Sequence, residues 1–309
     1  MTANEPVPVR VLTHNIRYAT KLPFGGEELW EVRRPRLINE LRYNTLHSAE
    51  AFICLQEVLH NQLMDIKNGL NRTHEPSRPS SPVPKWTYIG VGRDDGHQAG
   101  EYSPIFYQPS VWDLETFKTV WLSKTPETPS KSWDAASIRI LTIGKFQHRK
   151  SKKSVIAMNT HLDDQGSKSR YEGAKIILQE IKIHTDQGPG KNPLSVFLAG
   201  DLNSEPNQEA YQLLNDPKSH VSDLRDLIPP ENRYGHDDTF TGFGYEDEQP
   251  KRIDFLFLGR RGMLSSTDGS HARFEERWIS QGYSVLESRF EDAVYISDHR
   301  AVVGDVLLV

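Results

Sequence analysis

The feature that most constrains this chain is a series of short apolar segments that each meet polar side chains able to bind a metal ion or a phosphate. Short apolar runs bounded by polar residues are typical of buried strands. The polar groups are Thr13-His14-Asn15, Leu55-Gln56-Glu57, Asn159-Thr160-His161, Gly200-Asp201-Leu202-Asn203, Arg252-Ile253-Asp254 and Ser297-Asp298-His299. Taken singly, each group also fits a turn or a helix cap. Because strand ends of a rigid sheet are where α/β enzymes gather functional groups, the whole series predicts one site at a sheet edge.

Segments of strand type alternate with a few of helical type, which predicts a mixed α/β fold. The expected strands are residues 7–15, 52–55, 86–91, 102–107, 111–122, 138–146, 154–159, 194–199, 253–258 and 301–309. Helical periodicity predicts helices over residues 34–49 and 169–184, each covering a sheet face. The polar stretches 239–251 and 264–273 are expected to be surface loops. Because no repeat or linker divides the chain, we expect residues 1–309 to form a single domain.

Charge and cysteine content exclude several classes of protein. Lys and Arg number 37 against 42 Asp and Glu, a formal charge of −5, so no global positive field draws in a long polyanion. The single cysteine, Cys54, excludes an internal disulfide and a cysteine-based zinc site. No segment is long and apolar enough for a membrane span. We expect a soluble protein, cytoplasmic or secreted with its signal removed, and no protein partner is implied.

The residue types in the polar groups favour a hard divalent cation. Carboxylate and amide oxygens are supplied by Glu57, Asp201, Asp254, Asp298, Asn15 and Asn203. Such ligands favour Mg²⁺ or Mn²⁺ over zinc, and because Mg²⁺ takes only one or two protein carboxylates, the others are free to act as a base or to orient a neighbour. Adjacent residues of a strand face opposite ways, so Asp298 and His299 can share a site only at an irregular strand start, which we expect.

In this order, the groups resemble the motifs of the endonuclease/exonuclease/phosphatase superfamily, which has the deoxyribonuclease I-like fold. Residues 100–107, 121–123 and 132–134 resemble a poorly characterised microbial subgroup of metal-dependent hydrolases within it. The resemblance implies an α/β (α+β) four-layer sandwich, with two mixed β-sheets packed face to face and helices outside. It also implies divalent-metal-dependent hydrolysis of a phosphate ester by in-line attack of water.

The resemblance assigns metal-binding residues. Glu57 resembles the metal-binding glutamate, Asn15 resembles the asparagine that supports metal and phosphate, and Asp298 is assigned both to the metal and to orienting His299. The chain departs from the pattern at Arg17, where some nucleases of the superfamily carry an aspartate. Because a cation there opposes a second metal ion and can pair with phosphate, we expect one ion and a substrate-binding role for Arg17.

The resemblance also assigns the catalytic residues. Asp201 and Asn203 resemble the pair that positions the attacking water and the scissile phosphate. His161 resembles the histidine that donates to the phosphate or leaving group, with Asp254 near it, and His299 resembles the terminal histidine. The family leaves open whether Asp201 or His299 is the general base. We favour Asp201 as the base, with His299 holding a phosphoryl oxygen.

Further residues are candidates for contacts with substrate. Asn159, which belongs to the same strand end as His161, is expected to bind substrate. Trp133 and Glu101 are candidates for lining the cleft, with core packing for Trp133 and a surface position for Glu101 as the alternatives.

The sequence favours a phosphodiesterase or nuclease that acts on nucleic acid or a nucleotide-type diester. Aromatic residues that can stack on bases are Trp30, Trp121, Trp133 and Tyr245. The alternatives are a phosphomonoesterase acting on inositol phosphates, a sphingomyelinase-like lipid phosphodiesterase and a non-catalytic binding module. Polar long loops disfavour a lipid, the pair Arg260-Arg261 is too small a basic cluster to indicate an inositol phosphate, and the complete motif set disfavours a binding module.

Overall fold

The computed structural model describes residues 5–72, 85–185, 194–244, 247–260 and 277–309. Within these residues the strands form two mixed sheets. The first has the order β10 (Arg233–Gly235), β12 (Trp278–Val285), β13 (Val302–Leu308), β1 (Val7–Asn15), β2 (Phe52–Gln56), β4 (Ile105–Tyr107), β3 (Thr87–Ile89). The second has the order β5 (Trp112–Trp121), β6 (Ile140–His148), β7 (Ser154–His161), β8 (Ser195–Asp201), β11 (Asp254–Gly259), β9 (Val221–Asp223).

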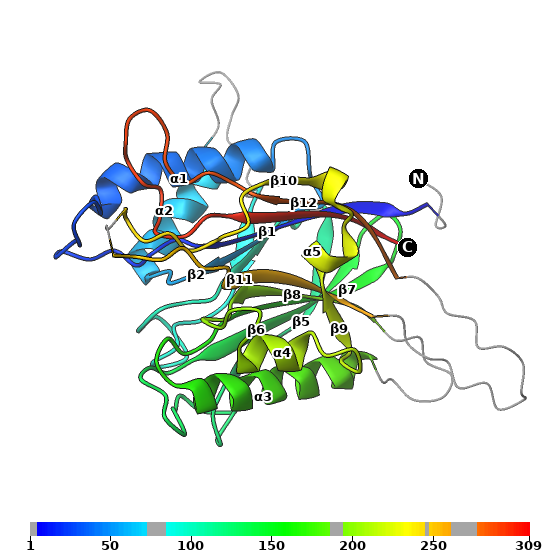
Figure 1. The fold of residues 1–309 in the computed structure, drawn as a ribbon. Helices are drawn as coiled ribbons and strands as arrows, with labels where there is room; N and C mark the ends of the chain where they lie inside the picture. Colours follow the sequence, from blue (N-terminus) through cyan, green and yellow to red (C-terminus); the bar gives the residue numbers. More distant parts are fainter. Residues whose placement is uncertain (1–4, 73–84, 186–193, 245–246, 261–276) are drawn as a thin grey trace, which may run out of the picture.

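The two sheets pack face to face between two layers of helices, as Figure 1 shows. Helices α1 (Trp30–Asn44) and α2 (His60–Asn71) cover the first sheet, and α3 (Ser167–Thr185) and α4 (Glu209–Leu214) cover the second. Shorter helical turns follow at α5 (Leu224–Leu227) and η1 (Pro230–Asn232). The four-layer sandwich predicted from the sequence is confirmed.

The core between the sheets is built from alternate residues of each strand, because successive side chains of a strand face opposite ways. Phe52 of β2 lies at its centre, with its ring centroid 5.0 Å from Trp112, 5.1 Å from Phe146 and 5.4 Å from Phe197. Cys54 is buried there as a free thiol. The other faces of the strands pack against the helices and complete two further apolar clusters.

The same alternation places the polar strand ends on the inner face. In β8, Phe197 and Ala199 point into the core between the sheets, so Asp201, two residues further along, points the same way. Asp201 pairs with His161 in parallel β7 and with Asp254 in antiparallel β11. The ends of neighbouring strands therefore deliver acids and an imidazole to one sheet edge.

The predicted strands and the two predicted helices are all present, with shifted ends: the helix expected over 34–49 runs from Trp30 to Asn44. The sequence did not predict α2 or β12. The expected loop at 239–251 is partly paired, since Phe240 forms bridges with Lys251 and His299. The loop expected at 264–273 lies outside the described residues. Within the described part of the chain, none of the helices has the length and apolar character that crossing a bilayer requires.

Candidate active site

A cavity of about 720 Å³ opens where the two sheets meet at this edge. The segments beside the first sheet contribute Arg17, Tyr18, Glu57, Asp298 and His299 to its wall, and those of the second sheet contribute Arg139, His161, Asp201 and Asn203. Glu101 also lines it, which agrees with the cleft-lining candidate and not with the alternative of a surface position. The cavity brings together seven of the predicted site residues and lies at the end of the sheet, where the strand pattern predicted a site.

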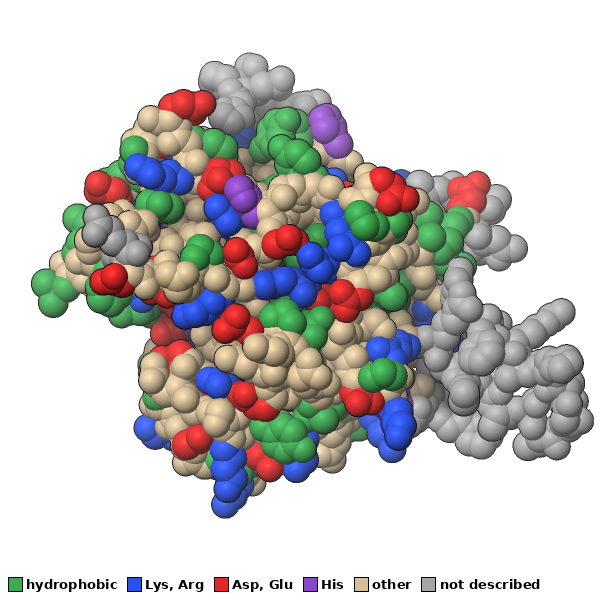
Figure 2. Space-filling view, in the orientation of Figure 1, with side chains coloured by type: hydrophobic (Ala, Val, Ile, Leu, Met, Phe, Trp, Pro, Cys, Tyr) green, Lys and Arg blue, Asp and Glu red, His purple; other side chains and the backbone are tan. Residues whose placement is uncertain are grey.

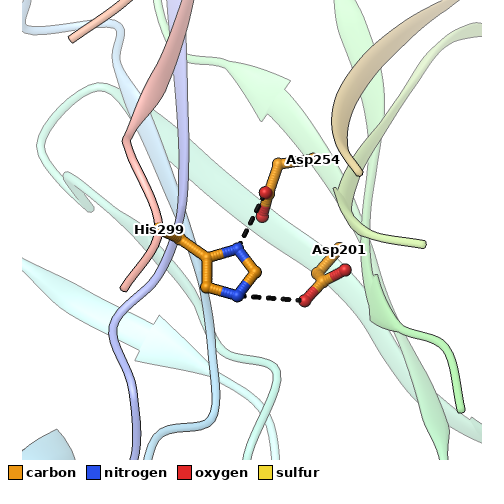
Figure 3. A group of neighbouring side chains, drawn as sticks. All are labelled: Asp201, Asp254 and His299. Carbon is orange, nitrogen blue, oxygen red and sulfur yellow. Dashed lines mark hydrogen bonds and ion pairs between the residues drawn. The ribbon is translucent and has the colours of Figure 1, made fainter. Parts of the chain in front are cut away.

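His299 lies between two aspartates, as Figure 3 shows. Its Nδ1 donates to Asp254 Oδ2 at 2.8 Å, and its Nε2 lies 3.8 Å from Asp201 Oδ2. All three side chains are buried. The expectation that Asp298 orients His299 is therefore wrong: Asp254 does so, and Asp298 Oδ1 instead accepts the Ser297 hydroxyl at 3.1 Å. Asp254 was expected near His161, but its direct partner is His299.

Burial and charge pull the pKa values of this group in opposite directions. Burial opposes the charged form of His299, but the negative charges of Asp254, Asp201 and Asp298 outweigh it and raise its pKa to about 10. Burial, reinforced by the neighbouring Asp254, raises the pKa of Asp201 to about 7. At neutral pH the site therefore holds an imidazolium beside a carboxylate that can take up a proton.

Asp298 and His299 both reach the cleft because they precede β13, before the regular alternation of the strand begins. The expected irregular strand start is confirmed. Burial raises the pKa of Asp298, and Glu57 adds to the increase through its negative charge. Two carboxylates that line one cavity and interact through their charges form a site that a cation would stabilise.

Asn15 holds the acids in place instead of reaching the cleft. Its Nδ2 donates to Glu57 Oε1 at 3.1 Å and to Asp201 Oδ2 at 2.9 Å, and its Oδ1 accepts the Arg17 N–H at 3.0 Å. Asn15 is fully buried and is not among the residues that line the cavity. The predicted metal-ligand and substrate-binding roles of Asn15 thus become a positioning role.

Arg17 and Glu57 both have positive φ angles of 58°, where non-glycine residues are uncommon. Such backbone conformations concentrate at functional sites. Arg17 is anchored through Nε to the buried Glu27 at 3.2 Å, its guanidinium lies over the Tyr18 ring at 4.2 Å, and its Nη1 is 3.9 Å from Glu57 Oε2. A fixed cation therefore stands beside the predicted metal ligand, where the sequence placed it.

On the opposite wall His161 sits between Asn203 and Glu101. Asn203 Nδ2 donates to His161 Nε2 at 3.0 Å, and His161 Nδ1 is 3.9 Å from Glu101 Oε2. Burial, together with the positive charges of Arg139 and Arg93, lowers the pKa of His161 well below its usual value, so the imidazole is neutral. Burial and the charge of Glu57 raise the pKa of Glu101 to about 7, against the effect of Arg93.

Sequence reasoning missed Arg93 and Arg139. Arg93 donates to both oxygens of Glu101, at 2.8 and 2.9 Å, and Arg139 bonds Asp163 and Asp164. Both arginines stand outside the strand-end motifs. The signal that could have pointed to Arg139 is a charged residue near the start of segment 138–146, directly before the apolar pair Ile140-Leu141.

Two predicted substrate-binding residues lie elsewhere. Asn159 is fully buried between the sheets, where its Nδ2 donates to the carbonyls of Leu55 and Pro104 and its Oδ1 accepts from Gln56. Trp133 is not among the residues that line the cavity. The segment around it instead caps a helix, because Asp134 accepts the Ser169 N–H of α3 at 2.7 Å. Both expectations are wrong.

The residues present fit a divalent cation. Asp201, Asp254 and His299 each offer one ligand atom, all within 4.8 Å of one another. In that group, however, His299 Nδ1 is already bonded to Asp254, so the three groups satisfy one another without an ion. Glu57 and Asp298 offer oxygen atoms alone, which are the ligands that Mg²⁺ and Mn²⁺ prefer.

A four-layer sandwich that collects carboxylates, amides and imidazoles at one sheet edge defines a phosphoester hydrolase of the deoxyribonuclease I-like fold. The chain belongs to the endonuclease/exonuclease/phosphatase family, which it matches over residues 12–299.

Solved structures agree with this assignment. The chain is similar to an endonuclease/exonuclease/phosphatase family protein of Bacteroides thetaiotaomicron, with 26% identity, a TM-score of 0.79 and coverage of 99% of both chains. The corresponding protein of Bacteroides vulgatus has 27% identity, a TM-score of 0.78 and coverage of 98% of this chain and 99% of that one. A mannosyl-6-phosphatase of Bacteroides thetaiotaomicron has 28% identity, a TM-score of 0.76 and coverage of 96% and 99%. No curated protein matches the chain by sequence.

Proposed function

We propose that this protein is a divalent-metal-dependent phosphomonoesterase that acts on a small polyhydroxylated phosphate, such as a hexose phosphate or an inositol phosphate. The observation that carries the proposal is the mixed wall of the cavity of about 720 Å³, which contains both guanidinium and carboxylate groups. Such a wall matches a ligand with many hydroxyl groups, which donate to carboxylates and accept from guanidinium groups. Similarity to a mannosyl-6-phosphatase at 28% identity supports the same choice.

This proposal departs from the nucleotide diester that the sequence favoured, because none of the three expected stacking residues that the structure describes lines the cleft. Trp30 and Trp121 are buried, with 2% and 7% of their surface exposed, and Trp133 lies outside the cavity wall. Tyr245 and Arg261 lie outside the described residues. On the face drawn in Figure 2, Lys and Arg side chains are interspersed with Asp and Glu side chains. The basic side chains form a short run near the centre of that face with acidic side chains on both sides, which is a small surface for a nucleic acid backbone.

We assign a single Mg²⁺ or Mn²⁺ ion to Glu57 and Asp298, with Asn15 holding Glu57 in place. The bound ion supplies charge that offsets the developing negative charge on the phosphate. Arg17 beside Glu57 disfavours a second ion and offers a guanidinium to a phosphate oxygen.

Side chains of the protein supply the general base, the contacts to the phosphate and the general acid. Asp201, with a pKa of about 7, accepts the proton of the attacking water. The Asn203 backbone N–H donates to Asp201 Oδ1 at 2.8 Å, and the Asn203 side chain, which donates to His161, lines the cavity and positions the phosphate. The His299 imidazolium donates to a phosphoryl oxygen. On the other side, Glu101 lies 3.9 Å from the neutral His161, and its pKa is raised to about 7. In its protonated form Glu101 gives its proton to the departing alkoxide, and it regains a proton from solvent while Asp201 releases the one it took from water.

A substrate panel in one buffer tests the proposal. Mannose 6-phosphate, inositol phosphates, p-nitrophenyl phosphate, bis-p-nitrophenyl phosphate, single-stranded DNA, RNA and sphingomyelin are incubated with Mg²⁺ or Mn²⁺, and product release is measured. We expect hydrolysis of the monoesters, loss of activity in EDTA and recovery with added metal. Cleavage of diesters without release of phosphate from any monoester would reject the proposed function, and activity that persists in EDTA would reject the metal.

A nucleotide phosphodiester is the second candidate substrate. Tyr18 and Phe240 both line the cavity, so two aromatic rings are available to contact a base. The nucleic acid arms of the same panel test this alternative directly.

A further inference from the structure

The wall of the cleft beyond His161 and Asn203 contains a group of polar side chains that the phosphate chemistry does not use. It comprises Glu205, Asp164 and Arg170, all of which line the cavity. They come from three segments: Asp164 follows β7, Glu205 follows β8, and Arg170 lies on α3. These segments meet directly beside the predicted phosphate position, because Glu205 is only two residues from Asn203.

Glu205 carries an acceptor with no partner. Its carboxylate makes no hydrogen bond or ion pair within the part of the chain that the structure describes, while its backbone N–H donates to Gln208 Oε1 at 2.9 Å. The Glu205 backbone is therefore fixed by a hydrogen bond, while its carboxylate lines the cavity and is available to a ligand. A carboxylate in this state repels a phosphate and attracts groups that donate hydrogen bonds.

Asp164 is a second acceptor, and its position is fixed. Its Oδ1 accepts from Arg139 Nη2 at 2.7 Å and its Oδ2 from Gln165 Nε2 at 2.8 Å, yet its side chain remains 45% exposed, and a carboxylate oxygen can accept more than one hydrogen bond. Arg139 is itself held by Asp163, which accepts the backbone N–H groups of Ala136 and Ser137. Asp164 is thus oriented without being covered.

Arg170 and Arg139 supply donors to the same wall. Arg170 donates through Nε to Glu209 at 2.7 Å and through Nη1 to the Asp163 carbonyl at 3.1 Å, and its Nη2 has no partner among the described residues. The Arg139 side chain is only 6% exposed, and its Nη1 also lacks a partner there. Two carboxylates and two guanidinium groups, each guanidinium with a nitrogen that has no partner among the described residues, therefore line the same cavity.

We propose that Glu205, Asp164 and Arg170 form a hydroxyl-binding subsite that selects a polyol as the leaving group of the reaction. This inference rests on the proposed function and deepens it. A sugar or cyclitol hydroxyl both donates and accepts hydrogen bonds, so neighbouring hydroxyls can donate to Glu205 and Asp164 and accept from Arg170. A site that hydrogen-bonds the hydroxyls of its substrate discriminates strongly against an ester that lacks them.

The test compares a polyol ester with an aryl ester of the same phosphate. Mannose 6-phosphate carries hydroxyls and p-nitrophenyl phosphate does not, so the ratio of their kcat/KM values isolates the subsite from the chemistry. We expect Glu205→Gln and Asp164→Asn each to lower this ratio about tenfold, mainly through a higher KM for mannose 6-phosphate. Glu231→Gln, at an exposed position outside the cavity wall, serves as the matched control and should leave the ratio unchanged.

The alternative outcomes each have a clear meaning. An unchanged ratio in both variants overturns the subsite, whether the two rates stay constant or fall together. A loss confined to glucosamine 6-phosphate would assign the free carboxylate to an ammonium group and also overturns it.

Failure of the proposed function itself is recognised separately. If the wild type cleaves only bis-p-nitrophenyl phosphate, the ratio of kcat/KM values cannot be measured. Inhibition of that cleavage by free mannose or inositol is then measured in its place. Inhibition that weakens in Glu205→Gln supports the subsite even then, and inhibition that is absent or unchanged rejects it.

Discussion

His299 Nδ1 lies 2.8 Å from Asp254 Oδ2, although 45 residues separate them in the chain. The contact depends on the pairing of β11 with β8, which sets Asp254 opposite Asp201 at the sheet edge. The imidazole is thereby placed between two carboxylates. Its charge is favoured by both, and its orientation is fixed by the nearer one.

Asp254→Asn removes the charge behind His299 but keeps an oxygen that can accept from Nδ1. Because Asp254 contributes to raising the pKa of His299 to about 10, its loss lowers that pKa and reduces the charged fraction of the imidazole as the pH rises. We expect turnover to fall roughly 10²- to 10⁴-fold, with a larger loss at pH 9 than at pH 6. A pH–rate profile measures this, with Asp113→Asn at an exposed ion pair as the control. An equal loss at every pH would contradict the role assigned to the charge.

Glu57→Gln tests the assignment of the metal. Glu57 accepts the N–H groups of Asn15 and Tyr18 through different oxygens, so the variant keeps an acceptor for only one of them and loses a negative charge at the proposed ligand. We expect the Mg²⁺ or Mn²⁺ concentration for half-maximal activity to rise roughly tenfold or more, with partial recovery at high metal concentration. Glu115→Gln, at an exposed ion pair with Lys145, is the matched control. An unaltered metal requirement would place the ion elsewhere in the cleft.

Asp201→Asn tests the cost of burying the proposed base. Burial raises the folded-state pKa of Asp201 to about 7, above the usual value of 3.8, so the wild type loses stability as the pH rises from about 4 to 7. Asparagine does not titrate, so this loss is absent in the variant. The difference in unfolding free energy, variant minus wild type, should therefore increase over this range in metal-free buffer and then level off. Urea unfolding at several pH values measures it, and a difference independent of pH would refute the shifted pKa.

The strand-end pattern was enough to predict the site. In every strand, alternation fixes which side chains face inward, and sheet pairing aligns the strand ends at one edge. Asp201 and His161 could be predicted without knowledge of distant packing, since each ends a strand whose inner face is largely apolar. The partner of His299 could not be predicted in the same way. Asp298 is its neighbour in sequence, but the pairing of β11 with β8 brings Asp254 to it instead.

Other misses have the same origin in packing across the sheets. Arg93 and Arg139 lie outside the motifs, and only the folded chain brings them to His161 and Glu101. Helix α2 and strand β12 have mixed patterns whose burial depends on their neighbours in space. Local sequence therefore predicts which strand ends carry function but not which side chains from other segments surround them.

Asn159 is a polar residue near a strand end that does not belong to the site. It shares the inward face of β7 with His161 but lies two residues deeper, so the first sheet covers it. Asn159→Ala would leave the carbonyls of Leu55 and Pro104 and the Gln56 amide without their buried partner. We expect a loss of about 2–4 kcal/mol in unfolding free energy, with kcat per folded molecule within about twofold of wild type. Urea unfolding and activity normalised to the folded fraction measure both quantities, with the exposed Asn232→Ala as the control. A large fall in kcat without a loss of stability would restore Asn159 to the substrate site.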